Sequence, residues 1–85
     1  MSGEGAPTVR LRLFAQAREA AGRSLDSFEA GDVASLLAEA RERYGPRFAA
    51  VLATSRVWVN GEALGADAIL RDGDEVAVLP PVSGG

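Results

Sequence analysis

The segment DVASLLAEARERYG (residues 32–45) predicts the main helix of this 85-residue chain, and that helix decides the fold. Its apolar side chains recur at the spacing of one helical face, at Val33, Leu36, Leu37, Ala40 and Tyr44. Asp32 stands where an N-cap residue is expected, and Gly45 and Pro46 end the helix. An amphipathic helix of this kind packs across one face of a sheet.

Two strands are predicted before the helix. In TVRLRLFA (residues 8–15), three apolar residues alternate with two arginines, which is the period of a strand with one buried face. The following QAREAAG (residues 16–22) is typical of a short helical turn that ends at its glycine. SLDSFEA (residues 24–30) indicates a second, weaker strand, which we expect beside the first.

A hairpin is predicted after the helix. RFAAVLA (residues 47–53) is expected to add a short turn, and RVWV (residues 56–59) is typical of a strand. Asn60-Gly61 is a strong hairpin signal because both residues tolerate the backbone angles of a tight turn, and it leads into EAL (residues 62–64).

A last strand is predicted close to the end of the sequence. The Asp72-Gly73 turn leads into EVAVL (residues 75–79). Pro80 and Pro81 end this strand, because neither residue has an N–H group to donate to a sheet.

The order of elements predicts an α+β domain with one mixed sheet of about five strands and one main helix on one face. A chain of 85 residues has room for one small domain and no large enclosed active site. We expect residues 1–7 to be a disordered leader, residues 8–79 to form the domain, and residues 80–85 to form an extended tail.

The composition excludes most side-chain catalysis. The sequence has no cysteine and no histidine, and all nine basic residues are arginine. A thiolate nucleophile, a disulfide, a persulfide-carrying side chain, a histidine base and a lysine Schiff base are therefore all excluded. The functional chemistry of this chain must come from something other than these groups.

Charge and hydropathy restrict the partners and the location. A net charge of −3 argues against nucleic-acid binding, which normally requires a basic patch. No apolar stretch approaches the roughly 20 residues of a membrane span, and MSGEGAP (residues 1–7) lacks the pattern of a signal peptide. We expect a cytoplasmic protein with protein partners, and no contact with nucleic acid or membrane.

Two groups of residues have a functional and a structural interpretation. Asp72, Asp74 and Glu75 carry the carboxylates that a hard cation prefers, but the Asp-Gly step favours a turn, so no metal site is predicted. Trp58 is expected to be half-buried packing, although a tryptophan beside a turn can also anchor an interface.

The last strand suggests a docking surface. Val76 and Val78 point to one face and Ala77 and Leu79 to the other, so both faces are apolar and the helix can cover only one. Phe14 falls on the same face as the arginines of the first strand. Phe14 and Leu79 could form an exposed apolar patch for a partner, and the alternative is a mildly apolar open face without a function.

The final PPVSGG (residues 80–85) is suited to entering another protein. The two prolines favour an extended course, so six residues could carry the terminus roughly 18 to 20 Å beyond the domain. Gly84 and Gly85 have no Cβ and can enter a channel too narrow for side chains. By itself, however, a terminal Gly-Gly is most often frayed chain.

Four segments in this order resemble the sulfur carriers of the ubiquitin-like β-grasp fold, specifically the small subunit of molybdopterin synthase. They are LFAQAREAAG (residues 13–22), the capped helix, VNGE (residues 59–62) and LRDGDEVAVLPPVSGG (residues 70–85). The similarity covers nearly the whole chain from Thr8, and the last segment is its most specific part.

The resemblance implies a function for the tail. In this family an E1-like adenylating enzyme uses ATP to adenylate the carboxylate equivalent to Gly85, and a sulfur donor protein completes its conversion to a thiocarboxylate. The thiocarboxylate then donates sulfur to cyclic pyranopterin monophosphate in the large subunit of molybdopterin synthase. Carried over by motif, Gly85 is the sulfur-carrying residue and Gly84 its slender approach, while Pro80, Pro81, Val82 and Ser83 are the tail that the partner guides. The domain itself is expected to bind no cofactor and no metal.

Other carriers and other classes remain open at this point. The thiamine-pathway carrier is similar but usually shorter, and a carrier for cysteine synthesis has the same general features. Ubiquitin-like protein modifiers use an activated glycine against a lysine amine. A β-grasp interaction module with an incidental tail is the alternative that carries no sulfur.

Overall fold

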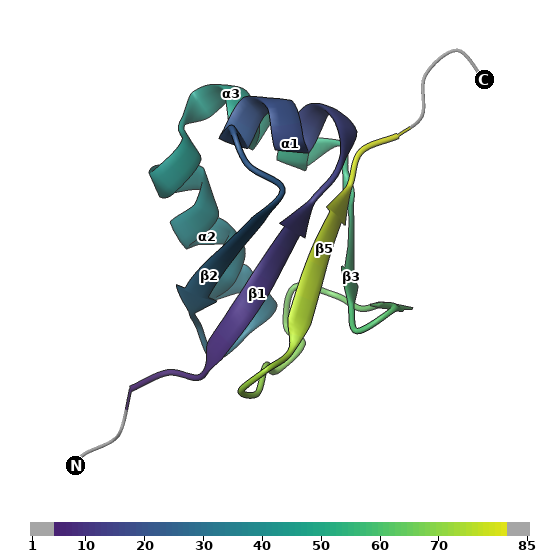
Figure 1. Cartoon of the computed structure of the whole chain (residues 1–85). Helices are drawn as coiled ribbons and strands as arrows, with labels where there is room; N and C mark the ends of the chain where they lie inside the picture. Colours follow the sequence, from purple (N-terminus) through teal and green to yellow (C-terminus); the bar gives the residue numbers. More distant parts are fainter. Residues whose placement is uncertain (1–4, 82–85) are drawn as a thin grey trace.

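The computed structural model describes residues 5–81, whose strands form one five-stranded sheet in the order β2-β1-β5-β3-β4 (Figure 1). The strands are β1 (Thr8–Leu13), β2 (Leu25–Glu29), β3 (Arg56–Val59), β4 (Glu62–Ala63) and β5 (Glu75–Leu79). β5 pairs parallel with β1 and antiparallel with β3, and the other pairs are antiparallel. The predicted α+β fold with a mixed sheet is confirmed.

The longest helix covers one face of this sheet, as predicted. The helices are α1 (Ala15–Ala21), α2 (Val33–Tyr44) and α3 (Pro46–Ala53). Asp32 caps α2, because its Oδ1 accepts a hydrogen bond from the Ser35 amide at 2.7 Å. α1 and α3 lie at the end of the sheet toward which β1 and β5 run (Figure 1).

The prediction of a short turn over residues 47–53 is wrong, because this segment belongs to the eight-residue helix α3. Gly45 has a φ of 98°, so the chain changes direction there and α2 ends. Pro46 then occupies the first turn of α3, where its missing N–H costs nothing. Phe48 and Leu52 lie four residues apart on one helical face and are buried.

The core lies between the sheet and the helices. Buried side chains alternate along β1 and β5 with more exposed ones, as the sequence predicted. α2 contributes Val33, Leu36 and Ala40. Leu37 and Tyr44, the other two residues of the predicted face, are partly buried against the same core. One apolar layer therefore holds the sheet and helices together.

Both predicted turns are confirmed. Asn60 and Gly61 have φ values of 50° and 86° and join β3 to β4 in an antiparallel pair, as the two central residues of a tight hairpin require. Gly73 also has a φ of 86°. Beside it, the Asp72 Oδ1 accepts a hydrogen bond from the Thr8 amide at 2.8 Å, which ties the turn before β5 to the start of β1.

The chain before β1 is described from residue 5. The Pro7 carbonyl accepts a hydrogen bond from the Ala30 amide at 3.0 Å, which continues the pairing of β1 and β2. The leader was predicted over residues 1–7, and its first four residues lie outside the described part. No helix within residues 5–81 has the length and apolar character needed to cross a bilayer.

Candidate functional site

The tail begins at the end of the sheet where α1 and α3 lie. The last residue of β5, Leu79, pairs with Arg56 of β3, and the half-buried Pro80 and the exposed Pro81 follow it. Val82, Ser83, Gly84 and Gly85 lie outside the described residues, so their roles stay predictions. The structure thus gives the point from which the tail leaves the domain.

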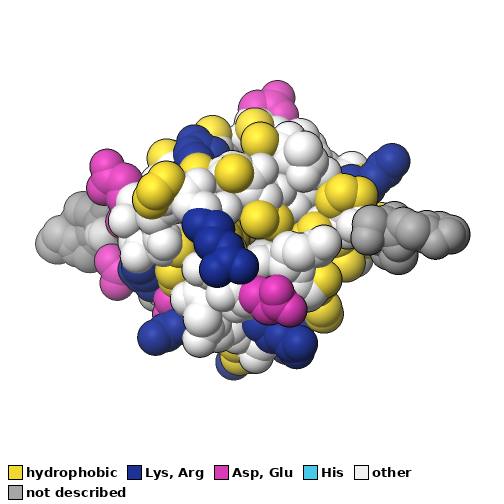
Figure 2. Space-filling view, turned by 90° about the horizontal axis from the view of Figure 1, so that it is seen from above, with side chains coloured by type: hydrophobic (Ala, Val, Ile, Leu, Met, Phe, Trp, Pro, Cys, Tyr) yellow, Lys and Arg dark blue, Asp and Glu magenta, His cyan; other side chains and the backbone are white. Residues whose placement is uncertain are grey.

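A shallow hollow of about 260 Å³ lies beside that point. It is lined by residues of α1 and α3 and by the start of the tail: Gln16, Ala50, Val51, Thr54, Pro80 and Pro81. Figure 2 looks onto this end of the molecule and shows apolar side chains exposed among a few charged ones. This hollow was not predicted from the sequence, because only a turn was expected over residues 47–53. The proline after Gly45 was the signal that a second helix begins there.

Phe14 is exposed, as predicted, with 39% of its surface accessible. It is the N-cap of α1, and its carbonyl accepts hydrogen bonds from the amides of Ala17 and Arg18. Leu13 is paired with Val78, so the register places Phe14 and Leu79 at the same end of two neighbouring strands. Leu79 is only half-buried, where the sequence suggested an exposed side chain, since β3 pairs with β5 on its other side.

The side chains that alternate with the core residues, Leu79 among them, form a surface that we call the open face. The register aligns one row of them across all five strands: Leu25, Arg12, Ala77, Trp58 and Ala63. Trp58 is 38% exposed and Leu25 is 43% exposed. Trp58 stands between the small Ala77 and Ala63 in this row, and an exposed tryptophan is suited to contact a partner.

The open face is also basic. Arg10, Arg12 and Arg56 alternate with core residues on β1 and β3. The Arg12 side chain of β1 forms an ion pair with Glu75 of β5, with 2.5 Å between Nε and Oε2. Both side chains remain well exposed, so this ion pair contributes little to folding stability and can be rearranged by a partner.

The carboxylates near the Asp72-Gly73 turn hold the turn together. The Asp74 carboxylate accepts hydrogen bonds from the Asn60 side-chain amide at 3.0 Å and from the Arg71 backbone amide at 2.9 Å. The hydrogen bond from Asn60 is the main reason that the pKa of Asp74 lies below its usual value. Within residues 5–81, no group of three carboxylates is arranged to hold a metal ion.

The site is therefore an exposed apolar surface beside the start of the tail. Two apolar features meet at one end of the sheet, the Phe14 and Leu79 pair and the hollow beside Pro80 and Pro81. Because the chain has no cysteine, histidine or lysine, its side chains offer no thiolate, imidazole or amine to act as a nucleophile or base. Such a site can present a tail to another protein, which would then supply the catalytic groups.

Comparison with known proteins agrees with this architecture. The sequence model of the ThiS family matches residues 11–85. A molybdopterin synthase sulfur carrier subunit from Chlamydomonas reinhardtii is 38% identical over 82 residues, which cover 91% of this chain and 98% of that protein. The subunit of the same name from Mycosarcoma maydis is 37% identical over 90 residues and covers 95% and 97%, respectively.

Solved structures share the fold. Small archaeal modifier protein 1 from Methanosarcina acetivorans superposes with a TM-score of 0.84 at 30% identity, covering 98% of this chain and all of that one. A complex of subunits 1 and 2 of the molybdopterin-converting factor from Helicobacter pylori contains a chain with a TM-score of 0.72 at 25% identity, covering 92% and 99%. Sequence and fold together place this chain in the ThiS family of ubiquitin-like β-grasp proteins.

Proposed function

We propose that this chain is the sulfur carrier subunit of a molybdopterin synthase and that the Gly85 carboxylate carries the sulfur. The observation that carries the proposal is the family match, which runs through the tail to Gly85. The names of the two relatives support the same pathway. In the Helicobacter pylori complex, a chain of this fold is bound to a second subunit, which supports a large subunit as partner here.

The chemistry of the proposal fits a chain that has no cysteine, histidine or lysine. A carboxylate is a poor acyl donor, because its oxygen is a poor leaving group. An E1-like adenylating enzyme would let the Gly85 carboxylate attack the α-phosphate of ATP, forming an acyl-adenylate and releasing pyrophosphate. Sulfur at the sulfide oxidation level, supplied by a sulfur donor protein, would then attack the acyl carbon and displace AMP, which leaves a thiocarboxylate. In the large subunit, the thiocarboxylate would transfer its sulfur to cyclic pyranopterin monophosphate, and water would supply the oxygen that returns Gly85 to a carboxylate.

The described residues suit the docking steps of this cycle. The carrier must bind two partners in turn, the activating enzyme and the large subunit, and must leave each of them again. The open face and the patch of Phe14 and Leu79 offer one contact surface of moderate size beside the tail. A moderate apolar contact with exposed charges around it dissociates faster than a large one.

Two linked experiments test the proposal. The chain is co-expressed with its activating enzyme and analysed by intact mass spectrometry, and the expected mass change is the replacement of one oxygen by sulfur. The modified chain is then mixed with a molybdopterin synthase large subunit and cyclic pyranopterin monophosphate. We expect the dithiolene-bearing pterin as product.

The matched control uses the acceptor of another pathway. The same modified chain is mixed with O-phosphoserine and a cysteine-synthase-like enzyme, and we expect no cysteine. Cysteine formation without any pterin product would move the chain to the cysteine pathway. An unmodified Gly85 after co-expression would contradict the carrier function itself.

A second candidate function is covalent protein modification, which the fold similarity to small archaeal modifier protein 1 favours. The adenylated Gly85 would then form an amide with a lysine of another protein and release AMP. This chain has no lysine, so it could not form lysine-linked chains with itself. Lysine-linked conjugates found by mass spectrometry in cells that express the chain would support this function, and their absence beside a thiocarboxylate would contradict it.

A further inference from the structure

One edge of the sheet is formed by β2, whose outer side has no neighbouring strand within residues 5–81. Backbone hydrogen bonds join Leu13 to Ser24 and Pro7 to Ala30. Between these two pairs, positions where β1 and β2 exchange hydrogen bonds alternate with positions where they do not. Ser27 is opposite Arg10 at a position where β1 and β2 exchange no hydrogen bond. The backbone groups of Leu25, Ser27 and Glu29 therefore point away from the sheet, and Ser27 is the middle one.

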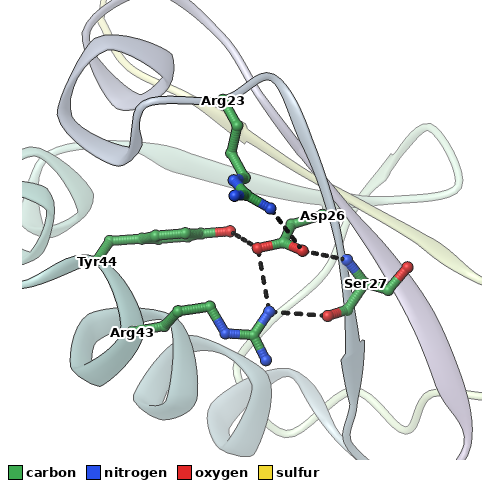
Figure 3. A network of polar contacts seen from close by, with 5 residues as sticks. All are labelled: Arg23, Asp26, Ser27, Arg43 and Tyr44. Carbon is green, nitrogen blue, oxygen red and sulfur yellow. Dashed lines mark hydrogen bonds and ion pairs between the residues drawn. The ribbon is translucent and has the colours of Figure 1, made fainter.

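Both outward groups of Ser27 are occupied by side chains (Figure 3). Its carbonyl accepts a hydrogen bond from the Arg43 Nη1 at 2.9 Å. Its amide donates to the Asp26 Oδ1 at 2.8 Å. Arg43 belongs to the last turn of α2, so a helix on the covered face of the sheet reaches round to the edge of β2.

Asp26 and Arg43 are held in this position by further contacts. The Arg43 Nη1 also donates to the Asp26 Oδ2 at 3.0 Å, and the Tyr44 hydroxyl donates to the same oxygen at 2.6 Å. The Arg43 guanidinium lies 3.8 Å from the centre of the buried Phe28 ring. Arg23 approaches the other Asp26 oxygen at 3.3 Å. The Asp26 side chain is only 12% exposed, so the network is anchored in the domain rather than lying loosely on its surface.

We propose that this network closes a strand-addition site, and that the occupant it excludes is the β2 edge of a second copy of this chain. An open strand edge is a template for another strand, and small proteins commonly block it. Here the block is specific, because Arg43 and Asp26 occupy the two backbone groups at the centre of the edge. The copies stay separate, and each keeps its open face and tail available.

The second copy fits this edge by symmetry. A two-fold axis at Ser27 would place Leu25 of each copy opposite Glu29 of the other and Ser27 opposite its equivalent. These three pairs would exchange about six hydrogen bonds between the two chains. An open hollow of about 310 Å³ lies beside this edge, lined in part by Phe28, Glu39 and Arg43. α2 therefore leaves room there for an added strand.

The test replaces the blocking group while keeping its apolar stem. Arg43→Met retains a side chain that packs over Phe28 but cannot donate a hydrogen bond to the Ser27 carbonyl. Sedimentation equilibrium is measured across a wide range of protein concentration. We expect the wild-type chain to remain a monomer. The Arg43→Met variant should form a dimer whose fraction rises with protein concentration. A folded Arg43→Met variant that remains a monomer would overturn the proposal.

Two control variants separate edge pairing from general destabilisation. Tyr44→Phe loses its hydrogen bond to Asp26 but keeps Arg43 on the Ser27 carbonyl, so it should remain a monomer. Ser27→Pro in the Arg43→Met background removes the outward N–H without breaking the pairing of β1 and β2, and should restore the monomer. A dimer that persists with Ser27→Pro would show that another surface associates.

A measurement on the wild-type chain tests whether the β2 edge is blocked at Ser27, even if the Arg43→Met variant does not fold. The Ser27 amide has an acceptor in Asp26, whereas the outward amides of Leu25 and Glu29 have none within residues 5–81. Amide hydrogen exchange followed by NMR should therefore be slower at Ser27 than at Leu25 and Glu29. Equal exchange at the three positions would mean that the edge is open in solution, which contradicts the proposal.

Discussion

At the scale of single residues, Asp26 is the carboxylate on which most interactions converge. Burial alone would raise its pKa, but the hydrogen bonds from Tyr44, Ser27 and Arg43, together with the charge of Arg23, lower the pKa below the usual 3.8. The hydrogen bond between Tyr44 and Asp26, which lowers the pKa of Asp26, raises the pKa of Tyr44. Burial first, and then the bond to Asp26, raise the pKa of the Tyr44 hydroxyl, which stays protonated as a donor.

The lowered pKa of Asp26 predicts a pH dependence of stability. A carboxylate with a lower pKa in the folded state stabilises the fold fully above the unfolded pKa of 3.8, and this contribution is lost as the pH falls through the folded pKa. At neutral pH, Asp26→Asn should lower the free energy of unfolding by about 2 kcal/mol, as expected for loss of hydrogen bonds to a charged group. Urea unfolding at several pH values measures the difference between the two proteins.

The difference in free energy of unfolding between the wild-type chain and Asp26→Asn should become smaller below pH 3.8. There the wild-type Asp26 loses the charge that the variant lacks. The other carboxylates titrate in both proteins, so they serve as the internal control. A difference that stays constant down to the acid limit of folding would mean that the charge on Asp26 contributes nothing.

At the scale of elements, α3 is where sequence and structure differ most. Its segment is short and apolar, and a run of this length has no periodicity that separates a turn from a buried helix. α3 is stabilised by its tertiary packing, since Phe48 is completely buried and contacts Tyr44 edge to face, with 5.0 Å between ring centres. The short helix therefore contributes one of the largest side chains of the core.

Phe48→Ala should lower the free energy of unfolding by about 3 to 5 kcal/mol, because it leaves a cavity in the core. A small domain has about 5 to 15 kcal/mol of stability in total, so the variant should be close to unfolding. The matched control is the exposed neighbour, and Arg47→Ala should change the stability by less than about 0.5 kcal/mol. Urea unfolding measures both, and similar values for the two would mean that α3 is not part of the core.

Both faces of β5 are apolar, but they differ in burial. Val76 and Val78 are completely buried in the core, whereas Ala77 and Leu79 are half-buried on the open face. The sequence pattern identified both faces correctly. The pattern could not give the exposure of Leu79. That exposure depends on the pairing of β5 with β3, a strand that lies well before β5 in the sequence.

Phe14→Asp and Leu79→Asp should each weaken binding to the large subunit or to the activating enzyme by at least roughly tenfold. A carboxylate at either position would lose its hydration in an apolar contact. Leu64→Asp is the control, since Leu64 is as exposed as Phe14 but lies outside the patch. Titration calorimetry with each partner measures the affinities, and normal binding of both variants would exclude the patch as the interface. Loss of folding would instead assign the residue to the core.

At the scale of the whole molecule, the sequence predicted the order of elements, the capped helix, both turns and the mixed sheet. These features depend on local patterns, such as the alternation in β1 and the Asn60-Gly61 pair. The block at the β2 edge and the hollow beside Pro80 depend on residues that are distant in sequence. No local pattern brings Arg43 to Ser27, so only the structure could identify that contact.

Removal of Gly84 and Gly85 should abolish sulfur transfer and leave the thermal unfolding midpoint nearly unchanged. Every core residue found within the described part of the chain lies between Val9 and Val78, so the domain should not depend on the last two glycines. Differential scanning calorimetry measures the midpoint, and the pterin assay described above measures transfer. A midpoint lowered by many degrees would make the tail structural rather than functional.

The central position of β5 has a consequence for synthesis on the ribosome. β5 lies between β1 and β3, so the earliest and latest strands of the chain are neighbours in the middle of the sheet. A nascent chain that has not yet released residues 75–79 lacks the partner of both strands, and contacts so distant in sequence form late. An incomplete carrier should therefore remain unfolded and open to proteolysis, and a folded domain would be a sign that translation has already passed β5.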